Sequence, residues 1–266
     1  MENIGIDVHK KESQLCIITE VGEVVELRIR TERGRFAEVL GKRPRAKVLM
    51  EASTESEWVA RCLEELGHEV VVADPNFVAM YGTRTRRVKT DKRDARALAD
   101  ACMSGNYRKA HRTSETRRQI RAQLAVRDSL VRGRAKHLVL MGSLVRQQGL
   151  RVTTGTADHF LERLDRVELP STLKAMLQPL VDAVKALNRS ILVVDEQLEE
   201  LAESDTQVAK LRTMPSVGPV TAAAFVATID DAKRFKGPHQ AEAYLGLVPS
   251  EKSSGEKQGS SAEFVG

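Results

Sequence analysis

Four carboxylates occur at positions where an acidic side chain is unexpected. Asp7 interrupts an apolar segment near the start of the chain, and Glu51 ends a second apolar segment. Asp91 and Asp94 are spaced i, i+3 at the start of an expected helix, so both side chains face the same side. Carboxylates brought together repel one another unless divalent cations lie between them, and oxygen ligands of this kind suit Mg²⁺ or Mn²⁺.

Each of these acids also has an ordinary structural interpretation. Asp7 could lie in a turn at the end of a strand, and Glu51 could lie on the surface before a helix. Asp91 and Asp94 could complement the positive end of a helix dipole. Taken together the four acids favour a metal site, in which two ions about 4 Å apart can hold the attacking and leaving oxygens of a phosphodiester.

The segments that must position these acids follow an α/β order. Expected strands span 3–8, 14–19, 24–29, 46–50 and 69–73, and expected helices span 34–40, 55–66 and 91–103. Three strands in succession, followed by strands that alternate with helices, predict a mixed sheet with an antiparallel start. Functional residues of open α/β sheets gather at the carboxyl ends of strands, which is where Asp7 and Glu51 fall.

The second half of the chain has a helical pattern. Apolar residues at helical spacing predict two long helices at 116–148 and about 180–201, either as a protruding coiled-coil-like hairpin or as an ordinary helical subdomain. A tight turn at 215–218 then joins two further helices. This pattern is typical of a helix-hairpin-helix element, whose backbone N–H groups can hold a phosphate near Gly218, or of a simple packing corner.

Composition limits the class of protein. The chain has 266 residues, of which 41% are hydrophobic and only 4% aromatic, so a single-strand binder that works by stacking is disfavoured. Its three cysteines lie far apart in the sequence, which argues against a zinc site or a disulfide framework and indicates a reducing, cytoplasmic environment. No apolar run approaches the roughly 20 residues of a membrane span, so we expect no membrane partner.

The positive charge is concentrated in two stretches. The chain carries 42 Lys+Arg against 37 Asp+Glu, a formal charge of +5, but the cations cluster at 84–96 and 117–151 while 195–205 is acidic. One basic helix face is usually just solvated, whereas two basic stretches around a group of acids favour nucleic acid. The residues expected to contact it are Lys10, Arg84, Arg86, Arg87, Lys89, Lys92, Arg93, Arg117, Arg118, Arg121, Arg132, Arg134 and Gly218.

Several blocks resemble the IS110 family of transposases. They are Gly-Ile-Asp-Val-His-Lys at 5–10, Glu-Ala-Ser at 51–53, Lys-Thr-Asp-Lys-Arg-Asp-Ala at 89–95, Pro-Ser-Val-Gly-Pro at 215–219, Ala-Tyr-Leu-Gly-Leu-Val-Pro at 243–249 and Ser-Ser-Gly at 253–255. The resemblance implies an RNase H/RuvC-like DEDD nuclease domain at 1–114, a coiled-coil dimerisation region at 115–205 and a small, mostly helical transposase domain at 206–266.

The resemblance also implies a mechanism. Asp7, Glu51, Asp91 and Asp94 would hold Mg²⁺, and Ser254 (or its neighbour Ser253) would be the nucleophile that forms a covalent link to DNA. A structured noncoding guide RNA, the bridge RNA, would pair with double-stranded donor and target DNA, and the chain would form dimers or tetramers. From the residues alone a Ser-Ser-Gly loop is usually only a loop, although a metal ion could activate its hydroxyl.

Two features depart from the family pattern. Ser216 stands where the hairpin usually has its first glycine. Family members continue beyond the Ser-Gly block with a basic segment and further helices, whereas this chain ends 12 residues after Ser254, so we expect a truncated C-terminal domain.

Three other functions compete with a recombinase. A RuvC-like nuclease or junction resolvase would use water and need no serine. A truncated remnant would bind nucleic acid without catalysis. An actin-like sugar kinase also begins with an acid on its first strand, but the chain lacks a glycine-rich phosphate loop after that strand, and the basic surface would be unexplained.

Overall fold

The computed structural model describes residues 1–81, 90–247, 250–254 and 257–261, the last two ranges by their backbone only. The chain divides into two compact units, Met1–Arg112 and Thr113–Gly266. Each unit is considered by itself below.

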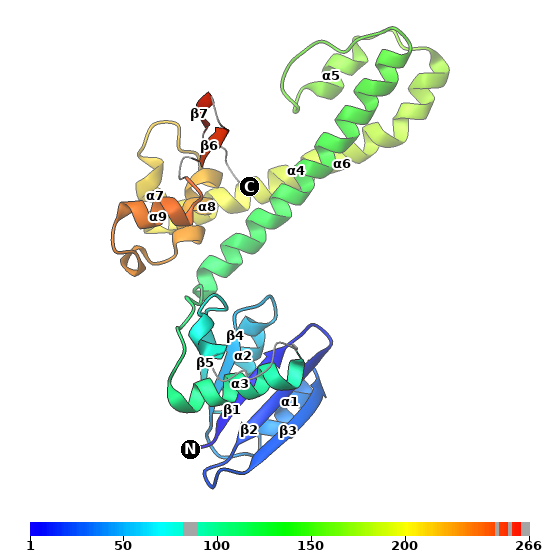
Figure 1. Ribbon diagram of the computed structural model, residues 1–266. Coiled ribbons are helices and arrows are strands. Elements are labelled where there is room, and N and C mark those ends of the chain that lie inside the picture. Colours follow the sequence, from blue (N-terminus) through cyan, green and yellow to red (C-terminus); the bar gives the residue numbers. More distant parts are fainter. Residues whose placement is uncertain (82–89, 248–249, 255–256, 262–266) are drawn as a thin grey trace. The chain divides into compact units, whose positions relative to one another are not determined.

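A five-stranded mixed sheet forms the centre of the first unit (Figure 1). Its strands lie in the order β3-β2-β1-β4-β5 and span Val24–Arg30, Glu12–Ile18, Asn3–Val8, Lys47–Glu51 and Glu69–Ala73. The first three strands form an antiparallel meander, and β4 and β5 continue the sheet parallel to β1. The predicted mixed sheet with an antiparallel start is thereby confirmed, in agreement with the RNase H-like α/β fold that the resemblance implies.

Helices cover both faces of this sheet. Helices α1 (Arg33–Leu40) and α2 (Ser56–Glu65) pack on one face, where Ile4, Ile6 and Met50 are buried with Phe36. Helix α3 (Asp91–Ser104) packs on the other face, and a short 3₁₀ helix (Val78–Tyr81) precedes it. Because alternate strand residues face opposite sides, the even-numbered residues of β1 contact α1 and α2 while the odd-numbered ones face α3.

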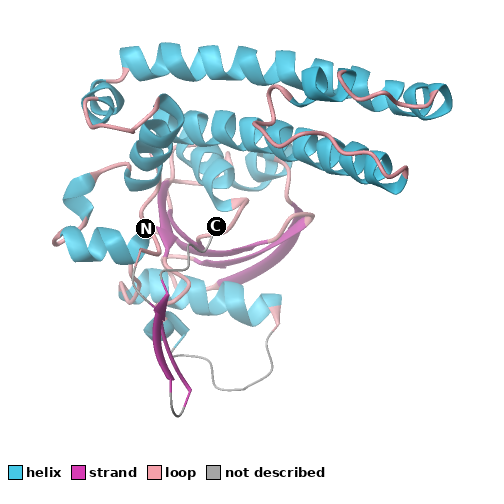
Figure 2. Ribbon diagram, turned by 90° about the horizontal axis from the view of Figure 1, so that it is seen from above, coloured by secondary structure: helices cyan, strands magenta, loops and turns pink. Residues whose placement is uncertain are grey.

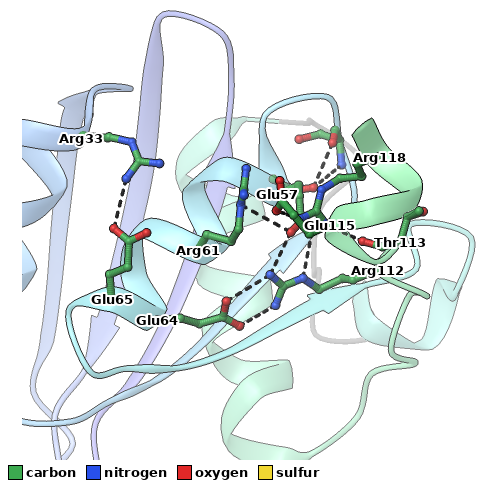
Figure 3. Close-up of polar contacts among 11 residues, drawn as sticks. Arg33, Glu57, Arg61, Glu64, Glu65, Arg112, Thr113, Glu115 and Arg118 are labelled. Carbon is green, nitrogen blue, oxygen red and sulfur yellow. Dashed lines mark hydrogen bonds and ion pairs between the residues drawn. The ribbon is translucent and has the colours of Figure 1, made fainter. Parts of the chain in front are cut away.

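The end of the first unit is tied to α2 by ion pairs (Figure 3). Arg112 donates hydrogen bonds from Nε and Nη2 to the two carboxylate oxygens of Glu57, at 2.9 and 3.1 Å. It also contacts Glu64, two turns further along α2, at 2.5 and 3.1 Å. A bidentate guanidinium of this kind holds the segment that follows α3 against α2.

Two long antiparallel helices dominate the second unit (Figures 1 and 2). Helix α4 spans Glu115–Gln147 and α6 spans Ser171–Ser204, with the short α5 (Phe160–Asp165) between them in sequence. The prediction placed the start of α6 at about residue 180, which was wrong. The helix includes Pro179, and burial of Leu173 and Leu177 against α4 stabilises the turns before that proline.

The remaining helices pack at one end of α4 and α6. Helix α7 (Thr206–Arg212) and α8 (Pro219–Ile229) flank the predicted turn, followed by a 3₁₀ turn (Ala232–Arg234) and α9 (Pro238–Tyr244). Strands β6 (Ser250–Ser254) and β7 (Lys257–Ser261) form an antiparallel hairpin. Within the described part of the chain, none of the helices combines the length and apolar character needed to cross a lipid bilayer.

Candidate functional site

Asp7 and Glu51 lie at the same edge of the sheet. Strands β1 and β4 are parallel, with Ile6 opposite Met50, so the next residues of the two strands, Asp7 and Glu51, come side by side at the carboxyl end. Both side chains belong to the face of the sheet that α3 covers, because Ile6 and Met50 point to the opposite face. The two acids are half-buried.

A glycine allows α3 to approach this edge. A Cβ atom added to Gly5 would lie 2.1 Å from the carbonyl oxygen of Ala95 and 2.3 Å from the backbone nitrogen of Ala99. Real Cβ contacts of this length do not occur, so only glycine permits the backbone of α3 to rest on β1. The small residues Ala95 and Ala99 complete this close packing against Cys16 of β2.

The first turn of α3 brings the other two acids to Asp7. Thr90 is the N-cap of α3. Its hydroxyl accepts a hydrogen bond from the backbone N–H of Arg93, and its carbonyl oxygen accepts one from the backbone N–H of Asp94. The helix therefore starts at Asp91, which is exposed, while Asp94 is only 5% exposed at the buried side of the same turn.

Asp7, His9 and Asp91 form a compact group of donor atoms. The Nε2 atom of His9 lies 3.2 Å from Oδ2 of Asp7 and 3.6 Å from Oδ1 of Asp91. One ligand atom from each of the three residues lies within 4.8 Å of the others. Two carboxylates and an imidazole at this separation are a donor set that fits a divalent cation.

The pKa of Asp7 reflects its burial and its charged neighbours. Burial raises the pKa of the Asp7 carboxyl; the nearby His9 lowers it, while the negative charges of Asp94 and Asp91 raise it again, and the net shift is upward. Two of the predicted ligands, Asp91 and Asp94, are thus close enough to Asp7 for their charges to be felt. A cation that neutralised this group would remove the repulsion.

Glu51 and Asp94 lie outside the compact donor group among the described residues, although both face the same region from β4 and α3. The structure therefore brings Asp7 and Asp91 within a single ion's reach and places Glu51 and Asp94 beside them. The role of all four as ligands stays a prediction.

Basic side chains near the carboxylates either line a cleft or lie on the first turn of α3. A cleft of about 550 Å³ next to the site is lined by His9, Lys10, Lys11 and Arg28 together with Asp91. Lys92 pairs with Glu26 of β3 at 3.4 Å, and Arg93 is exposed at the start of α3. The predicted contacts Arg84, Arg86, Arg87 and Lys89 lie outside the described residues.

The predicted nucleic-acid contacts of α4 have partners inside the second unit. Arg117 is only 9% exposed and donates hydrogen bonds to Asp205 and, at 3.0 Å, to Gln207. Arg121 donates to the carbonyl oxygens of Ala227 and Thr228 at the end of α8. These contacts favour a structural role for both arginines over contact with nucleic acid.

The other predicted arginines of α4 differ in exposure. Arg134 donates to Asp158 at 2.5 Å and to Asn188 of α6 at 3.1 Å, and Arg118 contacts Glu115 in its own helix. Arg132 is exposed and pairs with Asp128 one turn earlier, at 2.8 Å. Of these, Arg132 has the geometry of a surface contact residue.

The predicted hairpin and serine lie in the second unit. Gly218 is the N-cap of α8, and Ser216 in the preceding turn has a φ of 65°, in the left-handed region that favours glycine. The backbone of Ser254 ends β6 opposite Lys257, and its side chain lies outside the described residues. Whether Ser254 or Ser253 is a nucleophile stays a prediction.

His9 is the site residue that the sequence did not reveal. It follows Asp7 by two residues, just after the end of β1, and no spacing rule marks such a histidine as a neighbour of the first turn of α3. Only the packing of α3 on the sheet brings it to Asp91, 3.6 Å away.

Comparisons with known proteins agree across most of the chain. Residues 4–148 match the family model of the DEDD transposases of the IS110 type, and residues 208–264 match that of the transposase IS116/IS110/IS902 family. The transposase for insertion sequence element IS1111A of Coxiella burnetii is 28% identical over 261 residues, covering 96% of this chain and 70% of that protein.

Two further matches differ in strength. A probable family 20 transposase of Pseudomonas aeruginosa is 28% identical over 264 residues, covering 97% of this chain and 77% of that protein. Among solved structures, Thermus thermophilus RuvC in complex with a Holliday junction substrate has a TM-score of 0.30 and 16% identity, covering 41% of this chain and all of that one.

Proposed function

The chain belongs to the IS110 family of transposases, and on that premise we propose that it is an RNA-guided DNA recombinase that cuts and rejoins strands with a carboxylate-bound Mg²⁺ or Mn²⁺ and a serine nucleophile. The observation that supports this most is the convergence of Asp7 and Asp91 at the carboxyl edge of the sheet, with Asp94 beside them.

The donor set fits a hard divalent cation. Asp7, Glu51, Asp91 and Asp94 would hold it. Burial, together with the negative charges of Asp94 and Asp91, raises the pKa of Asp7, and a cation would favour the ionised carboxylate. A bound cation would supply positive charge at a phosphodiester and favour loss of the proton from the attacking hydroxyl. The side chains of Lys10, Lys11 and Arg28 beside the acids would attract the polyanion and orient its phosphates.

The remaining parts of the proposal concern partners and the second unit. We assign Ser254 as the nucleophile whose oxygen bonds to phosphorus as the 3′ or 5′ oxygen of the cut strand leaves, which conserves the phosphodiester energy for rejoining. A structured guide RNA would select double-stranded donor and target DNA. The antiparallel helices α4 and α6 would form the surface for dimers or tetramers of the chain.

A trapping experiment tests this function. The purified chain, loaded with its noncoding RNA and Mg²⁺, is incubated with labelled donor DNA, and denaturing gels detect a covalent protein–DNA product. We expect the adduct from the natural chain, its loss in Ser254→Ala, and its persistence in the control Ser216→Ala. Loss in Ser253→Ala instead would transfer the role to that residue.

Two results would favour other functions. Strand cleavage that persists in both serine variants without any adduct would indicate a water-using nuclease or junction resolvase. Binding of DNA and RNA without cleavage under any metal would indicate a nucleic-acid-binding remnant.

A further inference from the structure

The turn that carries His9 is held in place by buried hydroxyl groups. The hydroxyl of Thr31 donates a hydrogen bond to the carbonyl oxygen of His9 at 2.7 Å. The same hydroxyl is 2.8 Å from that of Ser13, which is fully buried, and the backbone N–H of Thr31 donates to the carbonyl of Lys11 at 3.0 Å. These bonds fix the turn between β1 and β2 on the end of β3.

The fixed turn aims the imidazole at two acids from different elements. Nε2 of His9 contacts Oδ2 of Asp7 on β1 and approaches Oδ1 of Asp91 on α3, at 3.2 and 3.6 Å. Here a single ring nitrogen faces two carboxylates whose oxygens lie within 4.8 Å of it and of each other.

We propose that His9 is a nitrogen ligand of the cation bound at Asp7 and Asp91, and that it shifts the preference of this site from Mg²⁺ toward first-row transition ions such as Mn²⁺. This inference rests on the metal site proposed above and adds to it an identified ligand and a selectivity. Mg²⁺ strongly prefers oxygen, whereas imidazole binds transition ions well, so one nitrogen in an otherwise oxygen set changes the order of affinities.

Pulsed electron paramagnetic resonance of bound Mn²⁺ tests the ligand directly. The full chain is loaded with one equivalent of Mn²⁺, and electron spin-echo modulation reports nitrogen nuclei bonded to the ion. We expect modulation from a histidine ¹⁴N that changes when the protein carries ¹⁵N-histidine and disappears in His9→Ala. The control His159→Ala removes an exposed histidine that pairs with Glu162 at 3.3 Å in the second unit, and it should keep the signal.

The selectivity is measured by competition between the two ions. We expect His9→Ala to weaken Mn²⁺ binding about tenfold and Mg²⁺ binding by less than about threefold, because only the transition ion gains from the nitrogen. His9→Gln, which keeps a polar side chain in the turn, should behave like His9→Ala, and circular dichroism establishes that both variants are folded.

The outcomes separate this inference from the proposed function. Mn²⁺ bound by the natural chain without histidine modulation, or modulation that persists in His9→Ala, would overturn the role of His9 and leave the carboxylate site standing. Failure of the natural chain to bind Mn²⁺ at all would overturn both.

Discussion

Gly5 on β1 and Ala95 on α3 are in backbone contact: a Cβ on Gly5 would lie 2.1 Å from the Ala95 carbonyl oxygen. This contact determines the distance between α3 and the sheet. Asp94, one residue before Ala95, and Asp7, two residues after Gly5, therefore come together at one end of the same contact. The glycine of the Gly-Ile-Asp block serves the site by allowing a helix to approach it.

Gly5→Ala should therefore push α3 away from the sheet. We expect a loss of stability of about 1–3 kcal/mol, since the added methyl group meets backbone that no side-chain rotation can relieve. Metal affinity should fall with it, because Asp91 and Asp94 move with the helix. Urea unfolding measures the first effect and calorimetry the second.

The matched control for this change is Gly34→Ala. Gly34 lies in α1, and a Cβ there meets nothing within 4 Å. Alanine should stabilise that helix by about 0.5–1 kcal/mol and leave metal binding unaltered. Equal effects of the two substitutions would contradict the account of Gly5.

The raised pKa of Asp7 predicts a pH-dependent effect of Asp7→Asn on the metal-free protein. A carboxyl whose pKa is higher in the folded state than its ordinary value of 3.8 destabilises the fold when it is ionised in both states. The asparagine variant should therefore be the more stable protein at pH 7. The difference should shrink as the pH falls through the raised pKa and vanish below about 3.8, where both states are protonated.

Thermal unfolding in a chelating buffer at several pH values measures this difference. Adding Mn²⁺ should reverse it, because the cation stabilises only the chain that retains Asp7. An asparagine variant that is less stable at pH 7 without metal would contradict the raised pKa of Asp7, which burial and the charges of Asp94 and Asp91 produce.

Truncation of Arg117 should lower the stability of the protein, whereas truncation of Arg132 should weaken nucleic-acid binding. Arg117→Ala leaves Asp205 half-buried without its guanidinium partner, which should cost about 3 kcal/mol of stability. Arg132 is exposed, so Arg132→Ala should change stability by less than about 0.5 kcal/mol while weakening nucleic-acid binding and its salt dependence. Unfolding curves and binding isotherms at two salt concentrations decide the matter; a stable Arg117→Ala protein would refute the structural role.

Ser216→Gly should stabilise the turn between α7 and α8. A φ of 65° destabilises the folded state by about 1–2 kcal/mol when the residue has a side chain, and glycine removes this strain. Glycine also loses more conformational entropy on folding, which offsets about 0.5–1 kcal/mol of the gain. A net gain of about 0.5–1 kcal/mol follows. Ser216→Ala keeps the strain, so a similar gain from alanine would mean that the backbone conformation is not the cause.

The sequence predicted the elements of the first unit well because their signals are local. Alternation in β1 and the small, regularly spaced apolar residues of α3 determine both elements without reference to the rest of the chain. Asp7 and Glu51 both lie at the carboxyl ends of strands, so the sequence also predicts that they lie at the same edge of the sheet.

Features that depend on contacts between residues far apart in the sequence could not be predicted. The burial of Arg117 requires Asp205, which is 88 residues away, and the start of α6 depends on Leu173 and Leu177 contacting α4. His9 likewise became a site residue only because Thr31, 22 residues later, anchors its turn. A pattern of charge or hydropathy in a single segment contains none of these relationships.

Calorimetric titration with Mn²⁺ tests the central claim, that carboxylates from β1, β4 and α3 hold a divalent cation. We expect saturable uptake by the natural chain, its loss or a reduction of at least about 100-fold in Asp7→Asn and Asp94→Asn, and full retention in Asp128→Asn, which removes an exposed acid of α4. Uptake that is absent from the natural chain, or equal in Asp7→Asn, would contradict the account.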